Sequence, residues 1–318
     1  MNNKSINILC ATDENYAPYY GIMLTSLFEN NKGVTVNVFV IVSKAFNERL
    51  LKRYHQLEDK YGQKISFIYI NDEFVKQYPI KSSGFWNIVT YYRMYVAELL
   101  PETIDKILYL DCDMIVTANL SHLWDIDLTG KAIAAVSNIR MYPDQYQRRM
   151  GYPAEAKYFN GGTLLINVDY WRKNHIGQQC RTFLENNYDK IVFYDQDILN
   201  AVLWDKKIHI PLTYNFQIRF LLKDMFAEQS PESKKEIIET MRNPYIIHYA
   251  YNVKPWSAVY YKMPYSEKWN YYKRLSPWAH EVKKLPRRKS LNWWVKRYVM
   301  WPIGLMKNNH GFITDKEI

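Results

Sequence analysis

Glycine is scarce in this 318-residue sequence, and the 11 glycines do not form either of the common phosphate-binding patterns. Neither G-x-G-x-x-G nor G-x-x-x-x-G-K-[ST] occurs, which excludes a dinucleotide fingerprint and a P-loop. A nucleotide bound by this chain must therefore have its phosphates neutralised in another way, for example by a cation.

Cysteine is scarce as well. Cys10, Cys112 and Cys180 are odd in number, widely spaced, and too few for a disulfide framework or a thiolate zinc site. The first residues lack the apolar run of a secretory signal, and no apolar stretch approaches the ~20 residues that cross a bilayer. We therefore expect a cytoplasmic protein without a transmembrane helix.

Apolar residues are abundant, at 48% hydrophobic and 16% aromatic, so disorder is excluded as the main state. The length suits one large domain or two modest ones. Residues 1–253 balance 28 basic against 28 acidic side chains, whereas residues 254–318 hold 14 against 4. This predicts a neutral body at 1–256 and a basic extension at 257–318 that seeks an anionic surface, either a membrane or a nucleic acid.

Apolar runs and amphipathic segments alternate through the first 255 residues. The runs predict strands at 6–12, 34–43, 65–70, 106–111 with a continuation at 114–116, 132–137 and 162–168. The amphipathic segments predict helices at 20–28, 46–61 and 91–100, from about 170, and from 197. This alternation predicts an α/β fold with a parallel sheet covered on both faces. Ligands bind such sheets where the strands end, so polar residues at strand ends are candidates.

Two acids, Asp111 and Asp113, follow the most apolar predicted strand. Residues two apart on a strand share a face, so both carboxylates can hold one cation while Cys112 points toward the core. Two carboxylates ~4 Å apart repel by ~4 kcal/mol at an effective dielectric near 20 unless a cation or a proton lies between them. Their hard oxygen ligands suit Mg²⁺ or Mn²⁺. A turn or helix cap is the simpler explanation of any D-x-D. The same pattern recurs at 125–127 and 195–197. Only the pair at 111 and 113 follows a predicted buried strand, and this position favours it as the cation site.

Other polar segments are candidates of the same kind. His248 ends an apolar run, as a buried core histidine would, but Lys254 follows in a proline-stiffened loop suited to a phosphate oxygen. An imidazole in an Asp/Asp/His site would favour Mn²⁺. Asp195-Gln196-Asp197 is typical of a helix start. Residues 158–162 predict a tight turn whose paired glycines let the backbone approach a ligand.

Seven segments, taken in order, resemble glycosyltransferase family 8, which includes bacterial galactosyl- and glucosyltransferases of lipopolysaccharide synthesis and, more distantly, glycogenin. They are ATDENY (11–16), TYYRM (90–94), KILYLDCDMIV (106–116), LWDIDL (123–128), YFNGGTLLIN (158–167), YDQDILN (194–200) and HYAYNVKPW (248–256). The resemblance implies a GT-A fold, a Rossmann-like α/β architecture with a mainly parallel sheet. It also implies a UDP-sugar donor, a manganese ion and retention of the anomeric configuration.

The resemblance also implies roles for individual residues. The metal ligands would be Asp111, Asp113 and His248. The nucleotide would be held by Ala11, Thr12, Asp13, Tyr16, Asp111, Cys112, Tyr251 and Lys254. The donor sugar would be surrounded by Arg93, Asn138, Asn160, Asp195 and Gln196. Two positions depart from the related lipooligosaccharide galactosyltransferases: Asn138 stands where they have an aspartate, and Tyr251 stands where they have a glycine.

The resulting expectation is a retaining hexosyltransferase that moves glucose or galactose from a UDP-hexose to a saccharide acceptor, in lipopolysaccharide or another cell-surface glycan. A neutral amide is a feeble nucleophile, which favours front-face substitution with Gln196 stabilising the cationic sugar. One alternative is a metal-dependent UDP-sugar hydrolase or nucleotidyltransferase. Another is a non-catalytic glycan- or nucleic-acid-binding protein, although no nucleic-acid recognition motif occurs and we expect no such partner.

The basic extension carries its own pattern. The run 283–289 is rich in Lys and Arg and precedes an apolar stripe at helical spacing. The stripe consists of Leu291, Trp294, Val295, Tyr298 and Val299. Basic residues beside such a stripe predict peripheral contact with an anionic membrane at its cytoplasmic face. The alternative is that the stripe packs on the catalytic domain.

Overall fold

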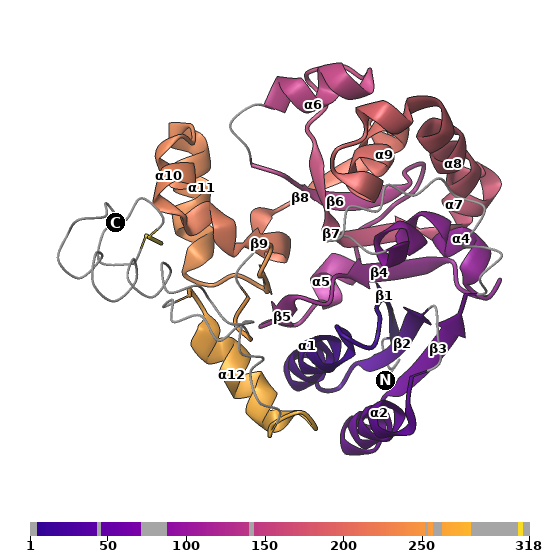
Figure 1. Cartoon of the computed structure of the whole chain (residues 1–318), viewed down its shortest axis with the longest axis vertical. Coiled ribbons are helices and arrows are strands. Elements are labelled where there is room, and N and C mark those ends of the chain that lie inside the picture. Colours follow the sequence, from indigo (N-terminus) through magenta and orange to yellow (C-terminus); the bar gives the residue numbers. More distant parts are fainter. Residues whose placement is uncertain are drawn as a thin grey trace, which may run out of the picture.

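The computed structural model of the chain describes residues 5–42, 46–70, 88–139, 143–251, 254–256, 263–280 and 311–313. Within them, a seven-stranded sheet has the order β3-β2-β1-β4-β7-β6-β8 (Figure 1). Its strands are β1 (Ser5–Ala11), β2 (Thr35–Val42), β3 (Lys64–Tyr69), β4 (Lys106–Leu110), β6 (Ile133–Ser137), β7 (Phe159–Asn167) and β8 (Lys207–Ile210). A three-stranded sheet is formed by β5 (Met114–Val116), β10 (Ile246–His248) and β9 (Phe216–Gln217).

The large sheet is mainly parallel, as predicted, with one reversed strand. Strands β1, β2, β3 and β4 run in parallel, as do β6 and β8, whereas β7 is antiparallel to both β4 and β6. The beginning of β7 therefore lies beside the end of β4. Leu110 pairs with Thr163, and the Asp111 N–H donates to the Gly162 carbonyl at 3.0 Å. Two candidate segments far apart in sequence thus become neighbours.

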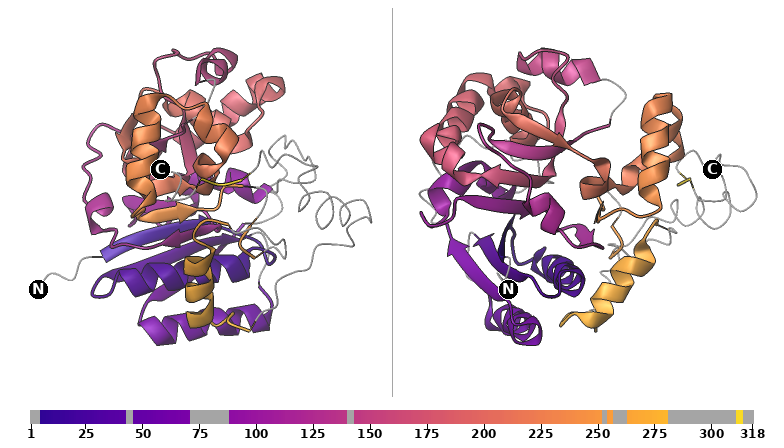
Figure 2. Two further views of the ribbon diagram at one scale, coloured as in Figure 1. Left: turned by 90° about the vertical axis from the view of Figure 1, so that its left-hand side faces the viewer. Right: turned by 180° about the vertical axis from the view of Figure 1, so that it is seen from behind.

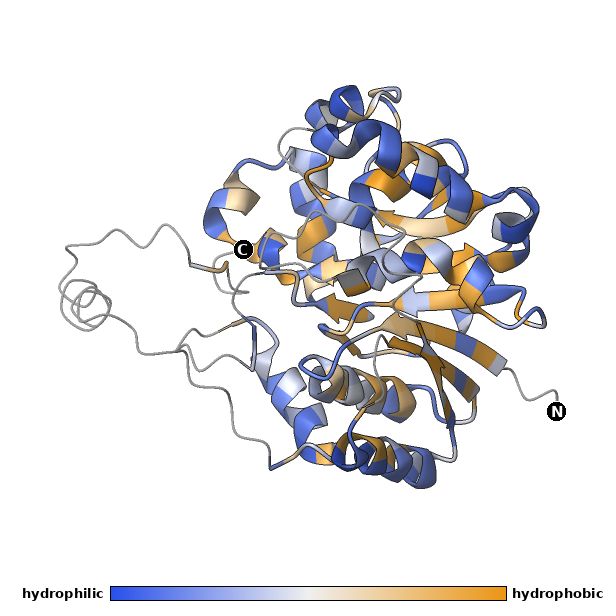
Figure 3. Cartoon of the chain, turned by 45° about the vertical axis from the view of Figure 1, so that its right-hand side comes forward, coloured by the Kyte–Doolittle hydropathy of each residue, from blue (hydrophilic) through white to orange (hydrophobic). Residues whose placement is uncertain are grey.

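Helices cover both faces of this sheet because its strands alternate apolar side chains between two cores. Ile8 and Cys10 face one core, with α1 (Ala17–Asn30) and α2 (Glu48–Tyr61), whereas Leu9 and Ala11 face the other. The second core is completed by the 3₁₀ helix η1 (Ile88–Tyr95), α4 (Val96–Leu99), α7 (Val168–Lys173), α8 (Ile176–Asn187) and α9 (Tyr194–Leu203). Figure 3 shows the apolar strands between helices with polar outer faces.

The remaining helices lie between or after the strands in the chain, and several of them add buried side chains to the core that contains α1. They are α5 (Ser121–Trp124), α6 (Pro143–Met150), α10 (Lys223–Ala227), α11 (Pro231–Met241), α12 (Ser266–Leu275) and the 3₁₀ helices η2 (Tyr188–Lys190), η3 (Leu212–Asn215) and η4 (Ile218–Leu221). Among the residues described, no helix combines the length and hydrophobicity needed to span a bilayer.

Helix α12 belongs to the predicted extension, and it packs on α1 (Figure 2). Tyr272 accepts a hydrogen bond from Asn30 Nδ2 at 2.7 Å, and Trp269 and Trp278 are buried in the core that contains α1. Trp278 lies so close to Gly21 that a Cβ there would stand 2.1 Å from its ring. The basic run 283–289 and the stripe 291–299 lie outside the described residues.

Gly21→Ala should therefore destabilise the protein. An alanine would favour an exposed helix by up to ~1 kcal/mol, but here its methyl would overlap the Trp278 ring, and overpacking costs ~1–3 kcal/mol. Urea unfolding should give a free energy of unfolding lower than that of the wild type. A more stable variant would show that Trp278 does not pack against α1 in this way.

Four local predictions differ from the structure. The helix expected at 91–100 is a 3₁₀ helix followed by one α-turn, and Arg93 in the 3₁₀ helix forms ion pairs with Asp111 and Asp195. Strand β5 joins the small sheet and does not continue β4, since the chain turns at 111–113. The segment 158–162 lies largely in β7, where a turn was expected. Helix α9 begins at Tyr194, three residues earlier than predicted.

Candidate active site

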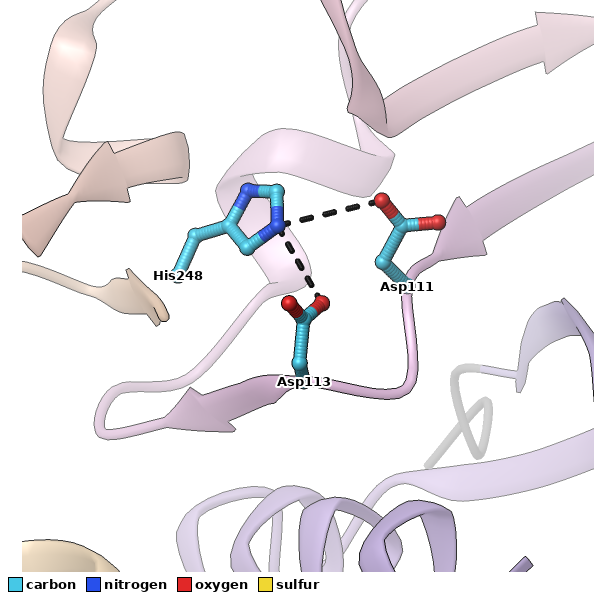
Figure 4. Close-up of side chains that lie close together, drawn as sticks. All are labelled: Asp111, Asp113 and His248. Carbon is cyan, nitrogen blue, oxygen red and sulfur yellow. Dashed lines mark ion pairs between the residues drawn. The ribbon is translucent and has the colours of Figure 1, made fainter. Parts of the chain in front are cut away.

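Asp111, Asp113 and His248 meet where β4 ends and the small sheet begins (Figure 4). His248 Nε2 lies 3.2 Å from Asp113 Oδ1 and 3.8 Å from Asp111 Oδ2. The pairing of β10 with β5 sets His248 opposite Met114 and so beside both acids. The two carboxylates converge from a turn, where a strand was expected, and the histidine adds a nitrogen ligand from 135 residues further along the chain.

The donor set fits a divalent cation. Carboxylate oxygens with one imidazole nitrogen suit Mn²⁺ better than Mg²⁺, which prefers oxygen alone. The ligand atoms of the three residues lie within 4.8 Å of one another. Gly162 forms one wall: a Cβ there would stand 2.6 Å from His248 Cε1 and 2.9 Å from Asp111 Oδ2. A side chain at this position would therefore enter the space between the ligands.

Lys254 lies on the other side of Asp113. Its Nζ is 2.6 Å from Asp113 Oδ2 and donates to the Tyr249 carbonyl at 2.8 Å. Burial by itself would raise the pKa of Asp113, but Lys254 and His248 outweigh it and hold that pKa well below its usual value. Asp113 thus stays ionised, as a metal ligand must be.

Arg93 supplies a fixed positive charge beneath Asp111. Its guanidinium donates to the Gly161 carbonyl at 2.5 Å and pairs with Asp111 at 3.1 Å and Asp195 at 2.9 Å. Burial alone would lower the pKa of Arg93, but the two carboxylates raise it overall. Its planar group also lies 4.4 Å from the centre of the Tyr109 ring, whose hydroxyl donates to Asp111. These contacts fix the orientation of Asp111.

The residues expected around the donor sugar lie beside this arginine. Gln196 Oε1 accepts hydrogen bonds from Asn160 Nδ2 and from the Gly161 N–H, both at 3.0 Å. Asp195, in the first turn of α9, is buried and paired with Arg93. The structure therefore brings Arg93, Asn160, Asp195 and Gln196 together.

Burial raises the pKa of Asp195 to about 6, even though Arg93 opposes the rise. The folded state therefore binds this proton more tightly than the unfolded state does. The stability that this provides is complete below about pH 4 and is lost as the pH rises through about 6. Relative to Asp195→Asn, the wild type should lose about 3 kcal/mol of unfolding free energy between pH 4 and 7.5. Urea unfolding at several pH values checks this, and a constant difference would contradict it.

The predicted nucleotide residues lie beside the Asp111–Asp113 turn. Cys112 Sγ is 3.3 Å from Cys10 Sγ, so Cys112 points toward the core and ties the turn to the end of β1. Ala11 and Thr12, two further residues expected to hold the nucleotide, follow Cys10 in the chain, and both are buried.

Asp13 and Tyr16 shape the start of α1. Asp13, one of the residues expected to hold the nucleotide, accepts hydrogen bonds through Oδ1 from the N–H groups of Asn15 and Tyr16, both at 2.9 Å, in the turn that leads into α1. Tyr16 is 42% exposed and its ring contacts Trp256 edge-on. Burial raises the pKa of Tyr16 to about 12, so its hydroxyl is neutral at physiological pH.

Asn138 and Tyr251, the two departures, have distinct settings. Asn138 Oδ1 accepts from Gln217 Nε2 at 3.3 Å, and Gln217 pairs with His248 between β9 and β10. Tyr251 is one of the residues expected to hold the nucleotide, and its N–H donates to the Tyr249 carbonyl at 2.7 Å. Phosphate binding through that N–H would require this bond to break.

Sequence reasoning missed Tyr109, Asn215 and Gln217. Asn215 Oδ1 accepts a hydrogen bond from His248 Nδ1 at 2.9 Å, and the side chains of Asn215 and Gln217 are both fully buried in an apolar segment. An amide residue within an apolar run was the signal in the sequence that could have identified them, because a buried polar group needs a hydrogen-bond partner. Asp127, of a second D-x-D, accepts from Thr129 in an exposed turn, as the simpler explanation predicts.

A mainly parallel sheet with an acid pair and a histidine where its central strand ends matches the GT-A glycosyltransferase fold that the resemblance implies. The chain belongs to the family described as "Glycosyl transferase family 8", whose model matches residues 7–259. The GT-A fold is confirmed by similarity to the crystal structure of the galactosyltransferase LgtC with donor and acceptor sugar analogs. The TM-score is 0.73 at 25% identity, over 92% of this chain and 100% of that one.

Several known proteins are similar in sequence over most of this chain. General stress protein A of Bacillus subtilis is 29% identical to this chain, and the match covers 87% of this chain and 96% of that protein. A lipopolysaccharide 1,2-glucosyltransferase of Escherichia coli is 25% identical, covering 93% and 85%. A lipopolysaccharide 1,3-galactosyltransferase of Salmonella typhimurium is 26% identical, covering 86% and 79%.

Proposed function

We propose that the protein transfers a hexose, glucose or galactose, from a UDP-hexose to a saccharide acceptor with retention, and that Mn²⁺ serves as cofactor. The observation that carries the proposal is the Asp111, Asp113 and His248 cluster, walled by Gly162 and flanked by Lys254. This cluster replaces the glycine-rich cradle that the sequence lacks.

Each part of the site has a task in this reaction. Asp111, Asp113 and His248 would hold Mn²⁺, which when bound supplies positive charge to the leaving diphosphate. Lys254 would move from Asp113 to a phosphate oxygen and add a second positive charge there. Arg93 and Asp195 would help to position the donor sugar, because both are buried next to Gln196 and are held by their ion pair.

Front-face substitution suits the arrangement of Gln196. Its Oε1 already accepts two hydrogen bonds, from Asn160 Nδ2 and the Gly161 N–H, so an attack on the anomeric carbon would have to sacrifice one of them. The acceptor hydroxyl would attack from the leaving-group side and lose its proton to a phosphate oxygen. Gln196 would stabilise the developing positive charge through its dipole.

The acceptor is proposed from the relatives, two of which are named as lipopolysaccharide glucosyl- and galactosyltransferases. We propose a lipopolysaccharide-type or other cell-surface glycan as acceptor, and a cytoplasmic location with peripheral contact at the membrane. Nucleic acid is not a proposed partner.

A screen of UDP-sugars for Mn²⁺-dependent UDP release, with and without candidate oligosaccharides, tests the proposal. The expected result is release from UDP-glucose or UDP-galactose that rises at least tenfold when an acceptor is added. Equal release without acceptor would identify a hydrolase, and pyrophosphate in place of UDP would identify a nucleotidyltransferase.

The basic run 283–289 should bind anionic lipid. Replacing its five Lys and Arg residues by Gln in the full chain should lower binding to vesicles containing phosphatidylglycerol at least tenfold, since each basic group contributes up to ~1 kcal/mol. Transfer to a soluble acceptor should be unchanged. Equal vesicle binding in a sedimentation assay would refute the membrane contact.

A further inference from the structure

A continuous chain of hydrogen bonds leads from His248 across the site to the buried carboxylate of Asp197. Its successive contacts are His248 Nδ1 to Asn215 Oδ1 (2.9 Å), Asn215 Nδ2 to Asn160 Oδ1 (2.8 Å), Asn160 Nδ2 to Gln196 Oε1 (3.0 Å), Gln196 Nε2 to Tyr158 Oη (3.1 Å) and Tyr158 Oη to Asp197 Oδ1 (2.7 Å). The chain thus joins a candidate metal ligand to the side chain expected beside the donor sugar.

The backbone of β7 determines which way two of these amides point. The Gly162 N–H donates to Asn160 Oδ1 at 2.9 Å, and the Gly161 N–H donates to Gln196 Oε1 at 3.0 Å. A backbone N–H can only donate, so the atom facing it must be the amide oxygen. The nitrogens of Asn160 and Gln196 are therefore directed along the chain.

This order extends to the metal ligand. Because Asn160 presents an oxygen, Asn215 must present its Nδ2 there, and its Oδ1 then faces His248. His248 must carry a hydrogen on Nδ1 to complete that contact. Its Nε2 is the ring nitrogen that faces Asp111 and Asp113, so the lone pair that a cation needs lies on the correct side.

At the Asp197 end of the chain the hydrogen bonds donate in the same direction. The Tyr158 hydroxyl accepts from Gln196 and donates to Asp197. Asp197 is fully buried, and its other oxygen accepts from Arg149 and from the N–H groups of Val192 and Phe193. Every bond therefore donates in one direction, from His248 toward a carboxylate, and hydrogen bonds in such a chain strengthen one another. A cation at Nε2 would strengthen the series in the same sense.

We propose that Asn215 is a positioning residue that performs two separable tasks. Through Oδ1 it keeps the hydrogen of His248 on Nδ1 and so orients Nε2 toward the cation. Through Nδ2 it holds Asn160, and with it Gln196, in the orientation that the donor sugar meets. The inference rests on the proposed function, in that Mn²⁺ is the cation and a UDP-hexose is the donor.

Two substitutions separate the tasks. In Asn215→Asp, one carboxylate oxygen still accepts from His248, but the other meets Asn160 Oδ1, so two acceptors face each other. In Asn215→Leu, which has a similar volume, both contacts are lost. Asn167→Asp is the matched control. It lies at the opposite end of β7 from Asn160, and aspartate there keeps the oxygen that caps α7 but loses the Nδ2 group that donates to the Leu128 carbonyl, so it also sets two acceptors face to face, away from the site.

Three measurements on the full chain test the proposal. Free Mn²⁺, counted by its EPR signal, gives the Mn²⁺ dissociation constant. UDP release at saturating Mn²⁺ gives turnover. Nitrogen NMR of the metal-free protein labelled with ¹⁵N-histidine, assigned by comparison with His248→Gln, shows which ring nitrogen carries the hydrogen.

Asn215→Leu should weaken Mn²⁺ binding about 10- to 100-fold, as loss of the partner of a metal-binding histidine commonly does. Asn215→Asp should bind Mn²⁺ within about threefold of the wild type, yet turn over at least about tenfold more slowly, the smallest loss usual for such a partner. Asn167→Asp should match the wild type in both. The NMR spectra should show a hydrogen on Nδ1 in the wild type and in Asn215→Asp, and its transfer to Nε2 in Asn215→Leu.

Wild-type Mn²⁺ affinity in Asn215→Leu, or wild-type turnover in Asn215→Asp, would overturn the proposal. A wild-type Nδ1 without a hydrogen would overturn it without any activity measurement. Failure of the proposed function is recognised separately: a wild type that binds no Mn²⁺ and releases no UDP would refute that function, and the NMR result would still decide the order of the hydrogen bonds.

Discussion

Asp113→Asn is expected to lower turnover about 10³-fold and to abolish measurable Mn²⁺ binding, the largest effect that we predict. Asp113 supplies a ligand oxygen 3.2 Å from His248 Nε2, and its negative charge also holds Lys254 at 2.6 Å. Asparagine keeps the shape but removes the charge, so both cations lose their partner. UDP release across a Mn²⁺ titration checks the result, with circular dichroism to verify the fold.

Asp127→Asn provides the control. It removes a carboxylate from another D-x-D, but one whose oxygen serves a turn with Thr129. That variant should bind Mn²⁺ and turn over like the wild type. If Asp113→Asn retained Mn²⁺-dependent activity close to that of Asp127→Asn, the metal assignment would be wrong.

Gly162→Ala is expected to lower turnover about 100-fold and to weaken Mn²⁺ binding at least tenfold, comparable with losing a partner of a metal ligand. The added Cβ would stand 2.6 Å from His248 Cε1, 2.8 Å from Met114 Cε and 2.9 Å from Asp111 Oδ2. His248 is held by the pairing of β10 with β5, so it cannot retreat without disturbing the small sheet. The methyl would therefore push the ligands apart.

Gly161→Ala serves for comparison, because it adds the same methyl one residue earlier on the same strand. Its nearest neighbour would be Arg93 Nη1 at 3.2 Å, a contact that a slight movement relieves. It should change the Mn²⁺ dissociation constant by less than threefold, or about 0.7 kcal/mol, compared with the 10- to 100-fold loss for a ligand partner. Equal Mn²⁺ affinities for the two variants would show that Gly162 does not wall the metal site.

Much of the fold could be predicted from sequence because its strands are strongly apolar. Apolar alternation in β1 and β2 located both strands within about two residues, and Asn47 and Gly62 cap α2 as their residue types favour. The direction of β7 could not be predicted in this way. A buried strand has the same composition in either direction, and the pairing that reverses it involves residues some 55 positions apart.

The candidate site divides similarly. Asp111 and Asp113 were selected because two carboxylates follow an apolar strand, and His248 because Lys254 follows it and the family resemblance implies it as a ligand; the structure brings the three together. Asn215 was missed because the role of an amide in an apolar run cannot be predicted until its hydrogen-bond partners are known. Those partners, His248 in β10 and Asn160 in β7, come from distant parts of the sequence, whereas Asn215 ends η3.

The sequence by itself determined the α/β class, the family and the acid pair, because these depend on local periodicity and on short motifs that lie within a few residues. Tertiary structure alone decided that β7 runs antiparallel to β4, that the Gly161 N–H meets Gln196, and that Asn215 meets His248 and Asn160. The physical reason is that a hydrogen bond needs its two atoms about 3 Å apart, and long-range strand pairing is what sets such distances.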